Sequence, residues 1–137
     1  PDYGLRGVTA ADAATDLIAT LNDSLGLKKY IGRSPGEFTI DFGGTVVVDE
    51  LDRLRAPPEG KPLLGAIVGN LGFQSNMGTV IIAVNDVFVT GAPLVTFKGV
   101  ENSFIAALPQ GLLHKKNRIA VYLVKGENLI ALDAQVE

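Results

Sequence analysis

The stretch "TVIIAVNDVFVT", residues Thr79–Thr90, indicates most directly how this chain folds. Two runs rich in β-branched residues flank Asn85-Asp86, a pair that tolerates the left-handed backbone of a two-residue hairpin turn. The first run, "TVIIAV", is apolar without alternation, which is typical of a strand covered on both faces. We therefore predict a β-hairpin whose first strand lies inside the protein, with an N-terminal helix as a candidate cover.

Short strand-like runs continue on both sides of this hairpin. On the N-terminal side, "EFTIDF" and "TVVVDE" flank Gly43-Gly44 and predict another hairpin, and "LLGAIVGNL" follows as a third apolar run. In "NRIAVYLV" the alternation predicts that Ile119, Val121 and Leu123 point into the core, while Arg118 and Tyr122 point away. The further C-terminal runs are "PLVTF", "SFIAALP" and "LIALDAQV".

These runs predict eight or nine short strands with turn signals between them. No helical pattern separates them, and parallel strands ordinarily need a helical crossover. The fold class predicted is therefore mainly β: an antiparallel immunoglobulin-like or jelly-roll-like β-sandwich with one N-terminal α-helix. The segment "LDRLRAPPEGKP" is expected to be a loop, because its prolines lack backbone donors, with one helical turn at "DELDRLR".

Residues 8–26 form the one clear helical pattern. Thr9 is placed to cap its start, and Gly26 is placed to end it in the left-handed conformation. Apolar residues recur at helical spacing and predict that the helix packs on its own domain. We expect one compact domain, with the helix and a connector over residues 1–35 and the sandwich over residues 36–137. The apolar stripe consists of Leu17, Ile18, Leu21 and Leu25.

Composition excludes several classes of function. The chain has 137 residues, a net charge of −3 and no cysteine. A nucleic-acid partner is not expected, because binding to phosphates requires a clustered basic surface. Disulfides and thiolate metal sites cannot form without cysteine. No apolar run reaches the ~20 residues needed to cross a bilayer, so no membrane insertion by these residues is expected.

Candidate catalytic groups are sparse. His114, the only histidine, lies between leucines and lysines in an expected exposed corner, whereas a Ser–His–Asp site needs a nucleophile and a buried carboxylate beside it. One histidine without cysteine is too few ligands for zinc. The carboxylates Asp49, Glu50 and Asp52 are interpreted as solvating charges, and the glycines of "GNLGFQSNMG" as turn and bulge residues. We expect no catalytic, cofactor-binding or metal-binding residue in this chain.

Aromatic side chains give little sign of a sugar-stacking platform. The chain has no tryptophan, and Tyr122 is the one tyrosine expected to point outward from a strand. A glycan site built from loop Asn, Asp and Gln side chains remains open. Five phenylalanines lie within strand patterns and are expected in the core: Phe38, Phe42, Phe88, Phe97 and Phe104.

The stretch "ALPQGLLHKKNRIAVYLV" is similar to the corner at which immunoglobulin-like and fibronectin-like sandwiches turn a strand. Pro109 is expected to end one strand, residues 111–113 to cross between sheets, and Asn117 to begin the next strand. A fibronectin-type tyrosine corner would have tyrosine where this chain has Ile119. The resemblance therefore concerns the architecture alone.

A closer resemblance covers most of the strand region. The succession "VIIAVNDVFVTGAPLV", "FIAALPQGLL" and "NRIAVYLV" resembles an extracytoplasmic domain near the C-terminus of bacterial membrane-anchored sulfatase-like proteins. In that family a "VAVNG" hairpin precedes "FSALVP", a leucine corner and "NRVEVFLV", and an "LIGR" segment comes earlier, as "KKYIGRSP" does here. This chain has Asn85-Asp86 in place of Asn-Gly, and lysines where Pro-Gly usually shapes the corner.

The resemblance implies a parent hydrolase of the alkaline-phosphatase superfamily, whose metal ligands and nucleophile lie outside these residues. We expect a non-catalytic accessory domain without a cofactor, located outside the cytoplasm as part of a membrane-anchored protein. Its expected partners are the rest of its own polypeptide, an envelope protein or a glycan. A glycan-binding module is the alternative, and an independent enzyme ranks third.

Overall fold

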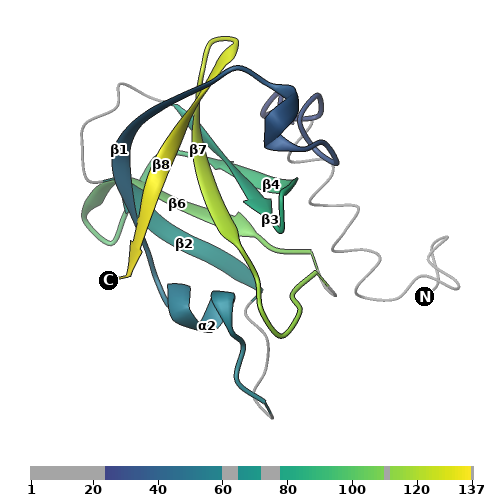
Figure 1. Ribbon diagram of the computed structural model, residues 1–137. Coiled ribbons are helices and arrows are strands. Elements are labelled where there is room, and N and C mark those ends of the chain that lie inside the picture. Colours follow the sequence, from purple (N-terminus) through teal and green to yellow (C-terminus); the bar gives the residue numbers. More distant parts are fainter. Residues whose placement is uncertain (1–23, 60–64, 72–77, 110–111, 137) are drawn as a thin grey trace, which may run out of the picture.

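The computed structural model describes residues 24–59, 65–71, 78–109 and 112–136 (Figure 1). Their strands form one sheet in the order β4-β3-β7-β8-β1-β2-β6-β5, which confirms the predicted mainly β class. The elements are η1 (Pro35–Glu37), β1 (Ile40–Val48), α2 (Leu51–Arg55), β2 (Ala66–Leu71), β3 (Thr79–Val84), β4 (Val87–Pro93), β5 (Val95–Phe97), β6 (Val100–Ala107), β7 (Ile119–Lys125) and β8 (Asn128–Val136).

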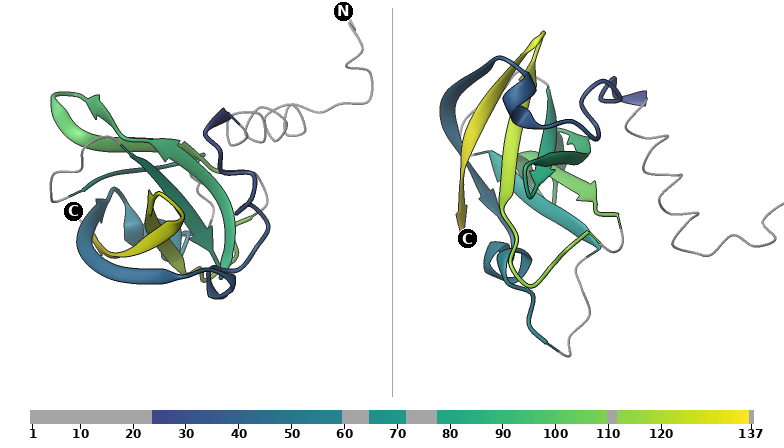
Figure 2. Two further views of the ribbon diagram at one scale, coloured as in Figure 1. Left: turned by 90° about the horizontal axis from the view of Figure 1, so that it is seen from above. Right: turned by 45° about the vertical axis from the view of Figure 1, so that its right-hand side comes forward.

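The expected pair of antiparallel sheets is not confirmed, because a single mixed sheet curls around the core (Figure 2). β4 and β6 lie in contact across the curl, although they are not neighbours in the strand order. β1 pairs with β8 in parallel, with Ile40 opposite Leu129 and Val48 opposite Val136. This parallel pair needs no crossover helix of its own, since the intervening strands of the domain connect its two members.

The predicted hairpin at Gly43-Gly44 is wrong. β1 continues through both glycines and stays paired with β8. Between Phe42 opposite Ala131 and Thr45 opposite Asp133, β1 advances by one residue more than β8, which is a β-bulge. Gly44 has a φ of 82°, a backbone conformation that glycine adopts without steric cost. Paired glycines suit a turn or a bulge equally well, and the presence of β8 beside β1 decides between them.

The hairpin of β3 and β4 is confirmed. Asn85 and Asp86 have φ values of 53° and 66°, both in the left-handed region expected of its turn. The expectation that β3 is covered on both faces is also correct, because residues 80–84 are at most 1% exposed. Ile82 belongs to the cluster inside the curled sheet, whereas Ile81 belongs to a second cluster on the outer face.

The inner cluster gathers side chains from β1, β2, β3, β4, β6, β7 and β8. It contains Ile119, Val121 and Leu123, as their alternation predicts. The predicted helical turn at residues 49–55 is present as α2, whose Leu51 and Leu54 are fully buried in the same cluster. α2 therefore packs against one end of the curled sheet (Figure 1).

The outer face of β3 and β4 is covered by the connector, residues 24–38. Its Leu27 and Tyr30 are each 1% exposed. The Gly32 N–H donates to the Phe88 carbonyl at 2.8 Å, and the Phe88 N–H donates to the Arg33 carbonyl at 2.9 Å. These two bonds occupy backbone groups that β4, as the outermost strand, would otherwise present unpaired. The connector thus supplies the cover that we expected from a helix.

Most of the predicted helix, residues 8–23, lies outside the described residues. Its expected end is described, and Gly26 has a φ of 74°, as predicted for a left-handed stop. Leu25 packs against the outer cluster.

Candidate functional site

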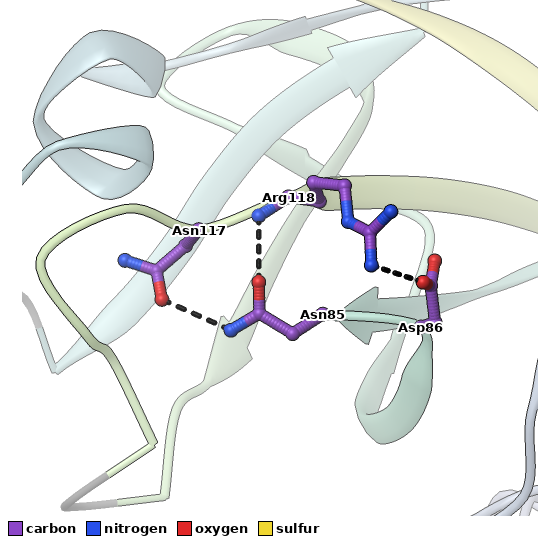
Figure 3. A network of polar contacts seen from close by, with 4 residues as sticks. All are labelled: Asn85, Asp86, Asn117 and Arg118. Atoms are coloured by element: carbon purple, nitrogen blue, oxygen red, sulfur yellow. Dashed lines mark hydrogen bonds and ion pairs between the residues drawn. The ribbon is translucent and has the colours of Figure 1, made fainter.

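A network of polar contacts joins the β3–β4 turn, the corner before β7 and the end of α2. Figure 3 shows its contacts among Asn85, Asp86, Asn117 and Arg118. Asn117, at its centre, is 7% exposed. Its Oδ1 accepts hydrogen bonds from the His114 N–H at 2.8 Å and from Asn85 Nδ2 at 3.1 Å. Its Nδ2 donates to the carbonyls of Leu54 at 3.0 Å and His114 at 2.9 Å. Every donor and acceptor position of this amide is therefore occupied.

The backbone of the same residues strengthens this Asn117 network. The Asn117 N–H donates to the Arg55 carbonyl at 2.7 Å, so Asn117 satisfies two carbonyls that α2 leaves free at its C-terminal end. Asn85 Oδ1 accepts the Arg118 N–H at 2.8 Å, and the Asn85 N–H donates to the Arg118 carbonyl at 2.9 Å. Three segments far apart in sequence are held together at this point.

Asp86 and Arg118 form an ion pair at the rim of the network (Figure 3). Their side chains are 62% and 76% exposed, so solvent screens the pair and its contribution to stability is small. The Asp86 carboxylate also acts on Tyr122. Burial first, and the charge of Asp86 second, raise the pKa of the Tyr122 hydroxyl above its ordinary value of 10.0.

His114 lies at the exposed corner where the sequence places it. It enters the Asn117 network through its backbone N–H and carbonyl, and its imidazole takes no part. In the described part of the chain, no hydroxyl or carboxylate is bonded to this imidazole. The pairing that a histidine-assisted nucleophile requires is therefore not seen at this corner.

The carboxylates at the end of β1 lie around the start of α2. Glu50 has a left-handed φ of 53°, and its Oε1 lies 3.4 Å from Nη1 of Arg53. Asp52 is exposed and Asp49 is half-buried. Within the described ranges, no group of three or more His, Cys, Asp or Glu side chains is arranged to hold a metal ion.

The aromatic residues depart from expectation at several positions. Phe88 and Phe104 are fully buried as predicted, but Phe42 is 87% exposed and was wrongly assigned to the core. Phe38 and Phe97 are half-buried. Phe42 shares the outer face of the sheet with Ile40, which packs against the outer cluster, and it is exposed because no described segment covers this face at Phe42.

Tyr122 faces away from the inner core, as predicted, yet it is not a free platform. Its ring packs edge-on against Phe88, with 5.3 Å between the ring centroids. Phe88 in turn contacts Tyr30, whose ring lies 6.0 Å away. Tyr122 therefore contributes to the outer cluster, and the described aromatic side chain most open to a ligand is Phe42.

Gly69 shows that one glycine of "GNLGFQSNMG" is neither a turn nor a bulge residue. It lies within β2, opposite Phe104 on β6. A Cβ at this position would lie 2.7 Å from Cζ of Phe104 and 2.6 Å from the Val47 carbonyl oxygen. The glycine is needed because the Phe104 ring occupies the space that a side chain would take. Residues 72–77 of the stretch lie outside the described residues.

The role of Asn117 escaped the sequence reasoning. The chain pattern marked it as a small polar group at the start of a strand. No local signal indicated that its amide reaches the carbonyl of Leu54, 63 residues earlier. The available signal was an asparagine placed between two apolar runs, because a side-chain amide that becomes buried requires hydrogen-bond partners.

Comparison with family models, curated proteins and solved structures finds no match for this chain. None of the described helices is long and apolar enough to cross a membrane.

Proposed function

We propose that this chain is a non-catalytic accessory domain of a larger membrane-anchored envelope protein, of the sulfatase-like type. The observation that carries the proposal is the hydrogen bonding at the corner before β7, which contains His114, the only histidine of the chain. Asn117 commits its whole amide to holding that corner against α2 and the β3–β4 turn. The polar groups gathered here stabilise the fold, so we assign the corner a structural role.

The family resemblance supports this reading in a second way. Its three motifs correspond to the β3–β4 hairpin, the end of β6 with the corner, and β7. Asn85 and Asn117 belong to these motifs and bond to one another at 3.1 Å. The motifs of the resemblance thus include residues that depend on one another in the fold. This supports a structural domain of the same type as in that family, located outside the cytoplasm, with catalysis supplied by another part of the parent protein.

The test is to purify this chain, confirm a cooperative thermal transition, and offer aryl sulfate and aryl phosphate esters with divalent metals. We expect no hydrolysis above the buffer blank, because a nucleophile with an adjacent base or a complete metal site is required for turnover. Hydrolysis that His114→Ala abolishes would contradict the proposal and restore the corner as a catalytic site.

A glycan-binding module is the second candidate, and Phe42 favours it. An aromatic ring that is 87% exposed beside Gly43-Gly44 provides a face against which a sugar ring can stack. A glycan array with the unsubstituted chain and Phe42→Ala decides between the two functions. Specific binding that disappears in Phe42→Ala would replace the accessory-domain proposal with this one.

A further inference from the structure

The connector, residues 24–38, contributes to the outer cluster and not to the inner one. Its Leu27 and Tyr30 pack in the outer cluster with Ile81 and Phe88 of the β3–β4 hairpin. The inner cluster contains no described residue of the connector. Figure 2 shows the connector on the outside of the curled sheet. The core inside the sheet therefore does not depend on the connector, which can separate from the sheet without opening that core.

The backbone of the connector is bonded to β4 at Phe88. The Gly32 N–H donates to the Phe88 carbonyl, and the Phe88 N–H donates to the Arg33 carbonyl. The turns of the connector are closed by bonds of its own. The Tyr30 N–H donates to the Leu27 carbonyl at 2.9 Å, and the Arg33 N–H donates to the Tyr30 carbonyl at 3.0 Å. Separation from β4 would break the two bonds at Phe88 and keep these turns, so the connector can move as one unit.

Tyr30 brings an unbonded polar group into this contact. The residue is 1% exposed, and in the described part of the chain its Oη has no hydrogen-bond partner. Its ring packs against Phe38 and Phe88, whose centroids lie 4.9 Å and 6.0 Å away, and Lys29 Nζ lies 5.1 Å from its centroid. A buried hydroxyl without a hydrogen bond destabilises the state that buries it, because water bonds to it in any state that exposes it.

Two opposed contributions therefore act on the connector. Burial of Leu27 and of the Tyr30 ring favours the closed position, in which the connector covers β3 and β4. The unbonded hydroxyl favours an open position, and a phenylalanine at residue 30 would make the same ring contacts without this cost. Closure also occupies the backbone groups of Phe88 that β4, as the outermost strand, would otherwise present to another strand. An element balanced in this way can open locally while the rest of a domain stays folded.

We propose that the connector is a releasable strap, which opens as a unit while the sheet stays folded and thereby uncovers the edge of β4. The Tyr30 hydroxyl lowers the free energy required for this opening. Residues 1–23 precede the connector and are joined to β1 through it, so tension on that part of the chain is carried by the connector. The inference does not rest on the proposed accessory function, and it does not involve the Asn117 network.

Amide hydrogen exchange of the whole chain, followed residue by residue with NMR, tests whether the connector opens separately. We expect the Gly32 and Phe88 amides to be similarly protected from exchange, and less protected than the amides of β7, because opening of the connector frees only the former. Val46→Ala weakens the inner cluster, in which Val46 is fully buried. It should accelerate exchange in β7 and leave Gly32 and Phe88 unchanged. Protection of either amide equal to that of β7, or equal acceleration by Val46→Ala, would overturn the proposal.

The role of the hydroxyl is tested with Tyr30→Phe. The matched control is Tyr122→Phe, which removes a hydroxyl from a half-buried ring that packs against the same cluster. Tyr30→Phe should slow exchange of the Gly32 and Phe88 amides at least about fivefold, because it removes the unbonded group from the closed position. Tyr122→Phe should leave both rates within about twofold. Unchanged or faster exchange in Tyr30→Phe, or equal slowing in Tyr122→Phe, would overturn the role of the Tyr30 hydroxyl.

Discussion

The two halves of the outer sheet face differ in what covers them. Over β3, β4 and β7, the connector buries Leu27 and Tyr30 against the sheet, and Ile81 beneath it is fully buried. Over β2, β5 and β6, Ile105 and Val95 are each 44% exposed. The same sheet is thus a core surface on one half and an accessible surface on the other, and position in the fold determines the role of each aliphatic residue.

The largest difference in the free energy of unfolding is expected when a carboxylate is placed on one half of the outer face or on the other. Ile81→Asp should unfold the domain, at a cost of about 4 kcal/mol or more, because it leaves an unpaired charge beneath the connector. Ile105→Asp should change the free energy of unfolding by less than about 0.5 kcal/mol, the usual scale at exposed positions. Chemical denaturation of both variants measures the difference. Similar losses would show that the two halves are equally buried.

The Asn117 network is expected to have the next largest effect, because it ties the β3–β4 hairpin and β7 to α2. Asn117→Ala leaves the buried carbonyl of Leu54 and the part-buried groups of His114 and Asn85 without these partners, and it should cost about 3 kcal/mol. The matched control is His114→Ala, which removes a side chain outside the network and should cost less than about 0.5 kcal/mol. An equal cost for both substitutions would contradict the assigned role of the amide.

Contact between the connector and β4 can be tested at Gly91. A Cβ there would lie 2.3 Å from Cδ1 of Leu27 and 2.6 Å from the Val80 carbonyl oxygen. Gly91→Ala should therefore cost about 2 kcal/mol, as expected when a packed site is overfilled. In Gly43→Ala, the nearest atom would be Cγ2 of Ile130 at 3.9 Å, and the free energy of unfolding should hardly change. Thermal unfolding of the pair shows whether the connector packs closely.

The smallest effect concerns pH. Tyr122 has a pKa raised above 10.0, by burial first and by Asp86 second. A raised pKa in the folded state means that the associated stability is complete below pH 10 and is lost as pH rises through the folded pKa. Absorbance titration of the tyrosinate should place Tyr122 above 10.0, and Asp86→Asn should lower its pKa only partly, because burial remains. A pKa of 10.0 or less in the unsubstituted chain would show that Tyr122 is open to solvent.

Local patterns predicted several elements correctly. The pair Asn85-Asp86 predicts a hairpin turn, because both residues tolerate a left-handed backbone. The alternation of Ile119, Val121 and Leu123 predicts which face of their strand points into the core. The helical turn at α2 was also readable, because Leu51 and Leu54 have helical spacing before a proline-rich loop. Each of these features depends on residues that are neighbours along the chain.

Phe42 and Asn117 could not be placed by the same reasoning. Alternation places Phe42 on the same outer face as Ile40, yet Phe42 is 87% exposed because no described segment covers that face at this point. In the sequence Asn117 looks like an ordinary polar residue at the start of a strand. Its stabilising role comes from the carbonyls at the end of α2 to which it donates hydrogen bonds. In both cases the environment of the side chain depends on segments that lie far away in the sequence.

By itself, the sequence of this protein determined the strands, the β3–β4 turn and the apolar side of β7, since period and turn chemistry act over a few residues. The tertiary structure decided the parallel pairing of β1 with β8, the single curled sheet, which segment covers β3 and the exposure of Ile105 on β6. The physical reason is that strand neighbours and cover depend on which distant segments can be brought together and packed. The apolar run of β3 indicates that both of its faces are covered, but it does not indicate which distant segment provides the cover.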